Sequence, residues 1–254
     1  MMNNATTEKL HLLRMPGMAE EFNRQLTTPA NSDLSFEHRV RSMVDHEITL
    51  RDSKRLQVLL RRAMLPQSAS VEDIDYRAQR GLDKAEVQSL LTLDWIRNRN
   101  NLVMTGPTGT GKSWLACALA NQACRQGMAC HFVRVPILME NLATARATGG
   151  LHSRLQQLKR FDLLILDDWG IEPIPKRVQS DLLELIDSRA GVCSFLITSQ
   201  MPMNLWHDLF DNKTVADALM DRVVHSSYHV ELSGESLRKT QGVGRKGLRK
   251  KQNT

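Results

Sequence analysis

The chain has 254 residues, of which 41% are hydrophobic and 24% are charged, proportions that are typical of a globular protein with a buried core. The formal net charge is +6, and seven Lys and Arg residues with no acid lie between positions 238 and 254. Because this segment alone accounts for the positive net charge, we expect any polyanion to bind at this tail or at local basic patches.

Four cysteines stand at positions 117, 124, 130 and 193 without a C-x-x-C pair, which argues against a structural zinc site and favours reduced thiols. No basic-then-apolar signal segment opens the chain, and no apolar run approaches the roughly 18 residues of a membrane span. We therefore expect a cytoplasmic protein without a membrane association.

The first 75 residues carry no glycine-rich loop and no strand-like alternation, and we expect them to form a small all-helical N-terminal domain. Leu10, Leu13 and Met18 predict one short first helix. Residues 36–64 have apolar side chains near helical spacing and predict a longer helix, which ends before Pro66 because the residue preceding a proline avoids the helical region.

The longer helix carries five basic side chains on the side opposite its apolar positions: Arg51, Lys54, Arg55, Arg61 and Arg62. One interpretation is a solvated helix face whose charges pair with Asp45, Glu47 and Asp52. The other is a surface that contacts the phosphates of duplex DNA, which is bound mainly through Lys and Arg. Aromatic residues, which single-stranded nucleic acids need for base stacking, are only 5% of the chain, so duplex DNA is the favoured partner.

After a linker at about residues 67–88, short apolar runs alternate with longer amphipathic segments. Alternation of this kind predicts an α/β fold in which a parallel sheet lies between helices. We expect this domain to cover residues 76–239, followed by a basic flexible tail at 240–254 that either contacts DNA or only solubilises the chain. Five strands are expected, at 101–105, 131–135, 163–167, 194–198 and 228–232, and helices at 112–125, 137–147, 176–189 and 214–224.

The strongest motif lies between the first expected strand and the first helix of this domain. It fits G-x-x-x-x-G-K-[ST], with the residues Gly106, Pro107, Thr108, Gly109, Thr110, Gly111, Lys112 and Ser113. The glycines let the backbone N–H groups face phosphates, Lys112 reaches the β- and γ-phosphates, and the Ser113 hydroxyl is a ligand for Mg²⁺. The sequence therefore predicts a phosphate loop that binds a nucleotide with Mg²⁺.

A second motif is the apolar run at 163–166 followed by Asp167 and Asp168. Ligands bind outside the carboxyl ends of parallel strands, where these acids are expected. Asp167 is placed to hold Mg²⁺ through water, and Asp168 to orient or deprotonate the attacking water. The alternative is a strand that ends in solvated acids.

Two weaker signals follow. Thr198 and Ser199 end the next strand and either hold the lytic water or cap the helix that follows. Arg222 is a surface charge, an ion-pair partner of Asp221, or an arginine finger that reaches a neighbouring subunit's nucleotide. The chain lacks both a short arginine-rich lid and an N-K-x-D string, which favours ATP over GTP and hydrolysis over phosphoryl transfer.

In their order and spacing, these motifs resemble those of the IstB-type helper ATPases of bacterial insertion sequences. The resemblance also includes the Trp169-Gly170 pair and the segments at 216–218, 221–222 and 234–239. Such helpers belong to the AAA+ class and are similar to DnaC-type helicase loaders and DnaA-type initiators. The resemblance extends from about residue 10 to residue 239 and includes the basic helix.

The resemblance implies an ATPase that assembles as a homo-oligomer on duplex DNA, remodels the DNA and delivers it as a target to the element's transposase. It also implies that Asp167 holds Mg²⁺, Asp168 is the hydrolytic acid, and Thr198 and Ser199 form the first sensor. Arg222 matches the finger and Arg238 the second sensor. Asp168 stands where glutamate is usual and Ser199 where asparagine is common, which implies slow turnover. A DnaC-like helicase loader and a DNA-binding adaptor that never hydrolyses ATP are the alternatives.

Overall fold

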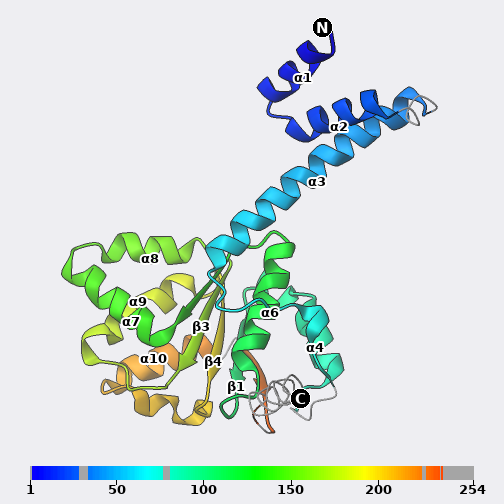
Figure 1. Cartoon of the computed structure of the whole chain (residues 1–254). Coiled ribbons are helices and arrows are strands. Elements are labelled where there is room, and N and C mark those ends of the chain that lie inside the picture. The colour runs from blue at the N-terminus through cyan, green and yellow to red at the C-terminus, as the bar shows by residue number, and fades with distance from the viewer. Residues whose placement is uncertain (1, 29–33, 77–80, 225–226, 235, 237–254) are drawn as a thin grey trace, which may run out of the picture. The chain divides into compact units, whose positions relative to one another are not determined.

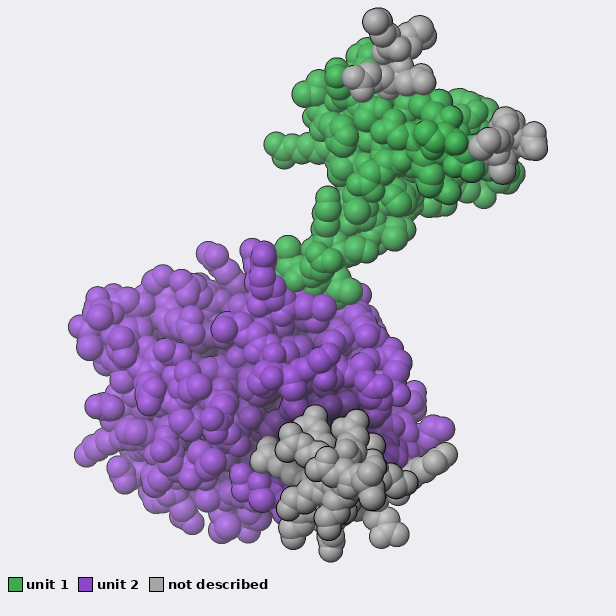
Figure 2. Space-filling view, in the orientation of Figure 1, with its two compact units in different colours: residues 1–58 green, residues 59–254 purple. Residues whose placement is uncertain are grey.

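The computed structural model describes residues 2–28, 34–76, 81–224, 227–234 and 236, with side chains from residue 5. Arg238 and the expected tail at 240–254 lie outside these residues. The chain divides into two compact units, residues 1–58 and 59–254 (Figure 2). Among the helices of the described ranges, none has both the length and the apolar run that crossing a membrane requires.

The first unit is helical, as the sequence predicts, and contains α1 (Met2–Leu12), α2 (Pro16–Thr27) and the larger part of α3 (Phe36–Ala63). The expectation of one short first helix was wrong. The chain turns at Arg14, whose φ of 58° ends the first helix, and Pro16 then starts the second, because a proline in the first helical turn loses no hydrogen bond.

The α2 helix is attached to α3 at its first turn. The buried Glu47 carboxylate accepts hydrogen bonds from the N–H groups of Gly17 (2.6 Å) and Met18 (3.1 Å). A side chain at Gly17 would place its Cβ 2.7 Å from the Glu47 Cα, so only glycine permits this approach. Glu47 therefore satisfies the free N–H groups of a helix start from another helix.

Residues 59–75, which the sequence analysis assigned to the helical domain, pack with the second unit. Ala63 and Ala69 are buried there, and the ring of His131 contacts the Arg62 carbonyl oxygen at 3.2 Å through its Nδ1. The short helix η2 (Val71–Asp73) is held by the ion pair between Glu72 and Arg125 at 2.6 Å. The expected linker also contains the start of α4 (Lys84–Leu91), and α5 (Asp94–Arg97) precedes the sheet.

The second unit contains one parallel sheet of five strands in the order β2-β3-β4-β1-β5, which confirms the predicted fold class. The observed ends lie within two residues of the expected ones. The strands are β1 (Asn101–Thr105), β2 (Cys130–Arg134), β3 (Leu163–Trp169), β4 (Ser194–Ser199) and β5 (Ser227–Glu231).

Helices cover both faces of this sheet, with α4 and α6 on one side and α7, α9 and α10 on the other (Figure 1). The helices after β1 are α6 (Lys112–Arg125), α7 (Val135–Ala147), α8 (Leu151–Lys159), α9 (Lys176–Arg189), η3 (Met203–Leu209) and α10 (Lys213–Val224). The sequence analysis missed α8, η3, α4 and α5. In α8 only Leu155 and Leu158 are fully buried, which leaves little periodic signal in a helix of nine residues.

Candidate nucleotide-binding site

The loop Gly106–Ser113 joins the carboxyl end of β1 to the start of α6, as the sequence predicts. Gly111 precedes the helix with a φ of 97°, and Gly106 has a φ of 140°. A Cβ at Gly106 would lie 2.0 Å from the Leu232 carbonyl oxygen, and a Cβ at Gly109 would lie 2.1 Å from the Ser236 hydroxyl oxygen. The loop is therefore both curled and closely covered by the segment that follows β5.

Lys112 lies at the centre of the curled loop and is only 7% exposed. Its Nζ donates to the carbonyl oxygens of Gly106 at 2.6 Å and Pro107 at 2.8 Å. The buried Thr110 hydroxyl also donates to Pro107, at 2.9 Å. The loop is thus closed by its own side chains, and the lysine ammonium is positioned inside the curve where phosphates are held in loops of this type.

Three elements meet at the Asp167 carboxylate, which is 5% exposed. Its Oδ1 accepts from the Ser113 hydroxyl of α6 at 2.6 Å and from the Thr198 hydroxyl of β4 at 2.5 Å. A hydroxyl and a carboxylate at this distance are the hard oxygen donors that Mg²⁺ prefers, so these residues fit a magnesium site. Burial, together with the nearby Asp167 charge, raises the pKa of the Cys117 thiol on α6 to about 11.

Thr198 and Ser199, which were predicted to act together, point to opposite faces of β4. The Thr198 hydroxyl donates to Asp167 and accepts from the Asp168 N–H at 3.3 Å. The Ser199 hydroxyl instead donates to the Trp169 carbonyl oxygen at 2.7 Å and accepts from the Met201 N–H at 3.0 Å. The structure brings Thr198, and not Ser199, to the acids.

Strand β3 continues through both acids to Trp169 and does not end at Asp167 as expected. The pairing with β4 shifts between Leu166 and Trp169, and Asp168 takes a φ of 61° within this bulge. Bulges often re-aim a side chain next to an active site. Here the bulge carries the Asp168 side chain to Arg134, whose Nε and second terminal nitrogen lie 2.8 and 2.7 Å from Asp168 Oδ2.

Sequence reasoning did not find Arg134, the last residue of β2. The only signal in the sequence is that a basic residue ends one strand while acids end another. That the two strands are neighbours is shown by the pairing of Arg134 with Asp167 in the sheet register.

Arg222 is not brought to the phosphate loop of its own chain. Its guanidinium pairs with Asp187 of α9 and also donates to the Ala218 carbonyl oxygen at 2.8 Å. Its own carbonyl oxygen accepts from the Asn101 side chain at 3.3 Å, at the first residue of β1. The phosphate loop follows the last residue of that strand, about 13 Å away at 3.3 Å per residue.

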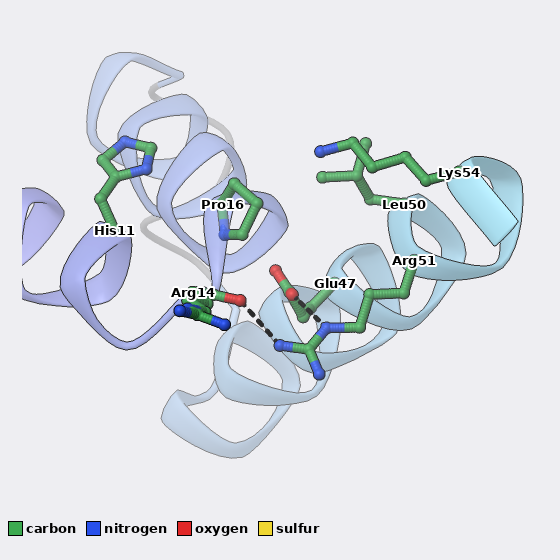
Figure 3. Close-up of a pocket in the computed structure, with 7 residues that line it drawn as sticks. All are labelled: His11, Arg14, Pro16, Glu47, Leu50, Arg51 and Lys54. Carbon is green, nitrogen blue, oxygen red and sulfur yellow. Dashed lines mark hydrogen bonds and ion pairs between the residues drawn. The ribbon is translucent and has the colours of Figure 1, made fainter. Parts of the chain in front are cut away.

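The basic residues expected to contact DNA fall into different surroundings. In the first unit a pocket of about 310 Å³ lies between α1, the start of α2 and α3. Figure 3 shows His11 and Lys54 on either side of Pro16, with Arg51 directed toward Glu47. The lining residues are His11, Arg14, Pro16, Glu47, Leu50, Arg51 and Lys54.

Arg51 is occupied by contacts within this unit. Its Nε donates to Glu47 at 2.5 Å and its terminal nitrogen to the Arg14 carbonyl oxygen at 2.8 Å. Burial alone would raise the pKa of Glu47, but the hydrogen bonds from Arg51, Met18 and Gly17 outweigh it and keep the pKa below its usual range. The ion-pair interpretation thus holds for Arg51.

The other basic residues of α3 that were predicted to contact DNA lie at the surface. Lys54 and Arg55 are exposed in the first unit, and Arg61 and Arg62 are exposed in the second. Within the described part of the chain, no ion pair involves His11, Arg14 or Lys54. The pocket therefore adds two side chains, His11 and Arg14, that the sequence analysis did not connect with Lys54.

The family of IstB-like ATP binding proteins matches residues 8–243. A Sinorhizobium fredii protein described as an insertion sequence ATP-binding protein is 43% identical over 242 residues, which cover 95% of this chain and 98% of the relative. The ATP-binding protein of insertion sequence IS1162 from Pseudomonas fluorescens is 47% identical over 203 residues, covering 80% and 88%.

Among solved structures, DnaI aligns with a TM-score of 0.55 and 21% identity, covering 69% of this chain and 93% of that chain. A sequence identity this low supports a shared fold and nothing further. The alignment agrees with the parallel sheet and with the position of the phosphate loop, and the second unit has an AAA+ fold.

Proposed function

Because the chain belongs to the family of IstB-like ATP-binding proteins of insertion sequences, we propose that it couples ATP hydrolysis to the delivery of duplex DNA to a transposase. In this proposal the protein assembles as a homo-oligomer on DNA in the ATP state and remodels the DNA. Hydrolysis then ends that state. Relatives in this family are named for insertion sequences, which favours this function over that of a helicase loader.

The observation that supports the ATPase part is the contact of Asp167 with Ser113 and Thr198 beside the phosphate loop. Backbone N–H groups between Gly106 and Gly111 would bind the phosphates, and Lys112 would neutralise the β- and γ-phosphates. Ser113 and Asp167 would hold Mg²⁺, which supplies positive charge against the phosphate oxygens when it is bound.

Hydrolysis requires a water oxygen to attack the γ-phosphorus while the bond to the β–γ bridging oxygen breaks, and ADP leaves with that electron pair. We assign acceptance of the water proton to Asp168, and alignment of the two acids to the Thr198 hydroxyl, which contacts both residues. A role of Ser199 in the first sensor finds no support in its contacts, because both are to the backbone. A role of Arg238 as second sensor rests on the resemblance alone.

Arg222 is proposed to act on the ATP of a neighbouring subunit. The distance from the phosphate loop of its own chain supports this, because Arg222 is fixed at the opposite end of β1. Fingers supplied by a neighbour raise turnover by about 10³–10⁵, since they neutralise charge that grows on the γ-phosphate. A mixture of Arg222→Ala and Lys112→Ala subunits, shown to co-assemble, should recover part of the turnover that each variant lacks.

DNA binding is proposed for the exposed basic side chains of α3 and its pocket: Lys54, Arg55, Arg61, Arg62, His11 and Arg14. The contacts would be to phosphates and therefore independent of sequence. Arg51 is assigned to holding the pocket together, because Glu47 and the Arg14 carbonyl oxygen already bind its guanidinium.

Calorimetry of ATP binding to Lys112→Ala tests the site, with Lys176→Ala, an exposed lysine on α9, as the matched control. We expect only Lys112→Ala to lose ATP binding, and parental affinity in that variant would overturn the assignment.

Electron microscopy with ATP and duplex DNA tests assembly. Asp168→Asn should bind ATP yet not turn it over, so that its complexes with DNA persist.

A further inference from the structure

The contacts of the Arg222 side chain fold it back onto its own subunit. They include the ion pair with Asp187 of α9 and the hydrogen bond to the Ala218 carbonyl oxygen, one turn earlier on α10. The ion pair lies at the surface, since the Arg222 and Asp187 side chains are 36% and 41% exposed. The guanidinium is thus held back yet accessible to another molecule.

Packing of α9 against α10 does not need this ion pair. The two helices already contribute Leu185, Ile186, Leu219 and Val223 to the buried core of the unit. An exposed ion pair adds little stability beyond such apolar contacts. The pair is therefore better explained by an effect on Arg222 than by a contribution to the fold.

We infer that Asp187 is a positioning residue that holds Arg222 back in the unassembled subunit and releases it to the phosphates of a neighbour's ATP during assembly. The inference rests on the proposed action of Arg222 between subunits. It adds a regulatory step, because the finger becomes available only when a second subunit offers a stronger anion than Asp187.

The exchange is physically favourable in the assembly and unfavourable outside it. A triphosphate carries more negative charge than one carboxylate, and guanidinium groups bind phosphate oxygens in a bidentate manner. The resting pair is exposed and correspondingly weak, so that it can be broken without a large barrier. Without a neighbour, Arg222 remains paired with Asp187 and folded back.

Turnover of ATP on saturating duplex DNA, measured against protein concentration, tests the inference. Asp187→Ala should reach half-maximal turnover at about two- to fivefold lower protein concentration, which corresponds to the loss of one exposed ion pair. Asp187→Glu, which retains the charge, should behave like the parent. Glu184→Ala, which removes an exposed carboxylate from the same helix, is the matched control and should leave the curve unchanged.

Thermal unfolding and ATP affinity of the isolated Asp187→Ala subunit should equal those of the parent, because the residue is proposed to affect assembly alone. An unchanged concentration curve, or a fall in maximal turnover, would overturn the inference. Arg222→Ala distinguishes the proposed finger role of Arg222 from the proposed holding role of Asp187. If that variant keeps DNA-stimulated turnover, the proposed finger is wrong; if it loses turnover while Asp187→Ala matches the parent, only the holding role of Asp187 is wrong.

Discussion

The Arg134 guanidinium binds the Asp168 carboxylate and thereby joins the end of β2 to the end of β3. Two of its nitrogen atoms lie 2.7 and 2.8 Å from the same carboxylate oxygen, Oδ2. The Asp168 side chain is 20% exposed, and its backbone N–H is bound to Thr198. The proposed proton acceptor is therefore restrained at both its backbone and its side chain.

Removing Arg134 should release this restraint. We expect Arg134→Ala to raise turnover in the absence of DNA by about two- to fivefold, the effect of losing one exposed pair, while ATP affinity is unchanged. Single-turnover hydrolysis measures the change. Arg125→Ala is the control, since it breaks the comparable pair with Glu72. Slower hydrolysis in Arg134→Ala would instead show that Arg134 orients Asp168 productively.

The Thr198 hydroxyl should matter for chemistry more than for binding. Thr198→Val keeps the shape of the side chain but loses the donor to Asp167 and the acceptor for the Asp168 N–H. We expect ATP turnover to fall by at least about tenfold, because an alignment error of this kind costs 1.4 kcal/mol or more in the barrier. ATP affinity should stay within about threefold. Normal turnover would remove Thr198 from the proposed site.

Ser199, the residue after Thr198, should matter for folding stability and not for turnover. Ser199→Ala leaves the Trp169 carbonyl and the Met201 N–H without their buried partner, which costs about 1–3 kcal/mol of folding stability. Turnover of the folded variant should match the parent. Chemical denaturation and steady-state hydrolysis measure the two effects. A large loss of turnover without a loss of stability would restore Ser199 to the predicted sensor.

The pocket between α1, α2 and α3 gives a prediction for DNA. Each phosphate contact contributes about −0.9 to the slope of log affinity against log salt. Arg14→Ala combined with Lys54→Ala should therefore flatten that slope by about two units. Arg51→Ala should leave the slope nearly unchanged, because its guanidinium binds Glu47 and the Arg14 carbonyl oxygen. Equal flattening by Arg51→Ala would contradict the assignment of Arg51 to contacts within its own unit.

Acid should weaken the packing of α2 on α3. Hydrogen bonds from Arg24, Gln25 and Ser42 to the Glu21 carboxylate lower its pKa from 4.5 to about 2, against the opposing effect of burial. A lowered folded-state pKa stabilises the fold at pH values above about 4.5, and this contribution is lost as the pH falls toward 2. Hydrogen-exchange protection of α2 should decline over this interval. Glu21→Gln should show a smaller decline, which then comes from Glu47, the other carboxylate with a lowered pKa that holds α2 to α3.

The sequence by itself determined the elements whose signals are local. The phosphate loop is a contiguous string in which glycines, a lysine and a serine all act on one ligand, and the structure places it between β1 and α6 as expected. The alternation of apolar runs with amphipathic segments likewise predicted the parallel sheet. Both signals depend on backbone conformation and periodicity, which neighbouring residues largely decide.

Only the tertiary structure decided which charged groups meet. Arg134 meets Asp168 because β2 lies beside β3 in the sheet. Arg222 meets Asp187 because α9 packs on α10. Thr198 and Ser199 have different partners because successive side chains of a β-strand point to opposite faces of the sheet. His11 and Arg14 join Lys54 because the chain turns back after α1. Such contacts connect residues far apart in sequence, so they depend on strand order and helix packing, which no single segment encodes.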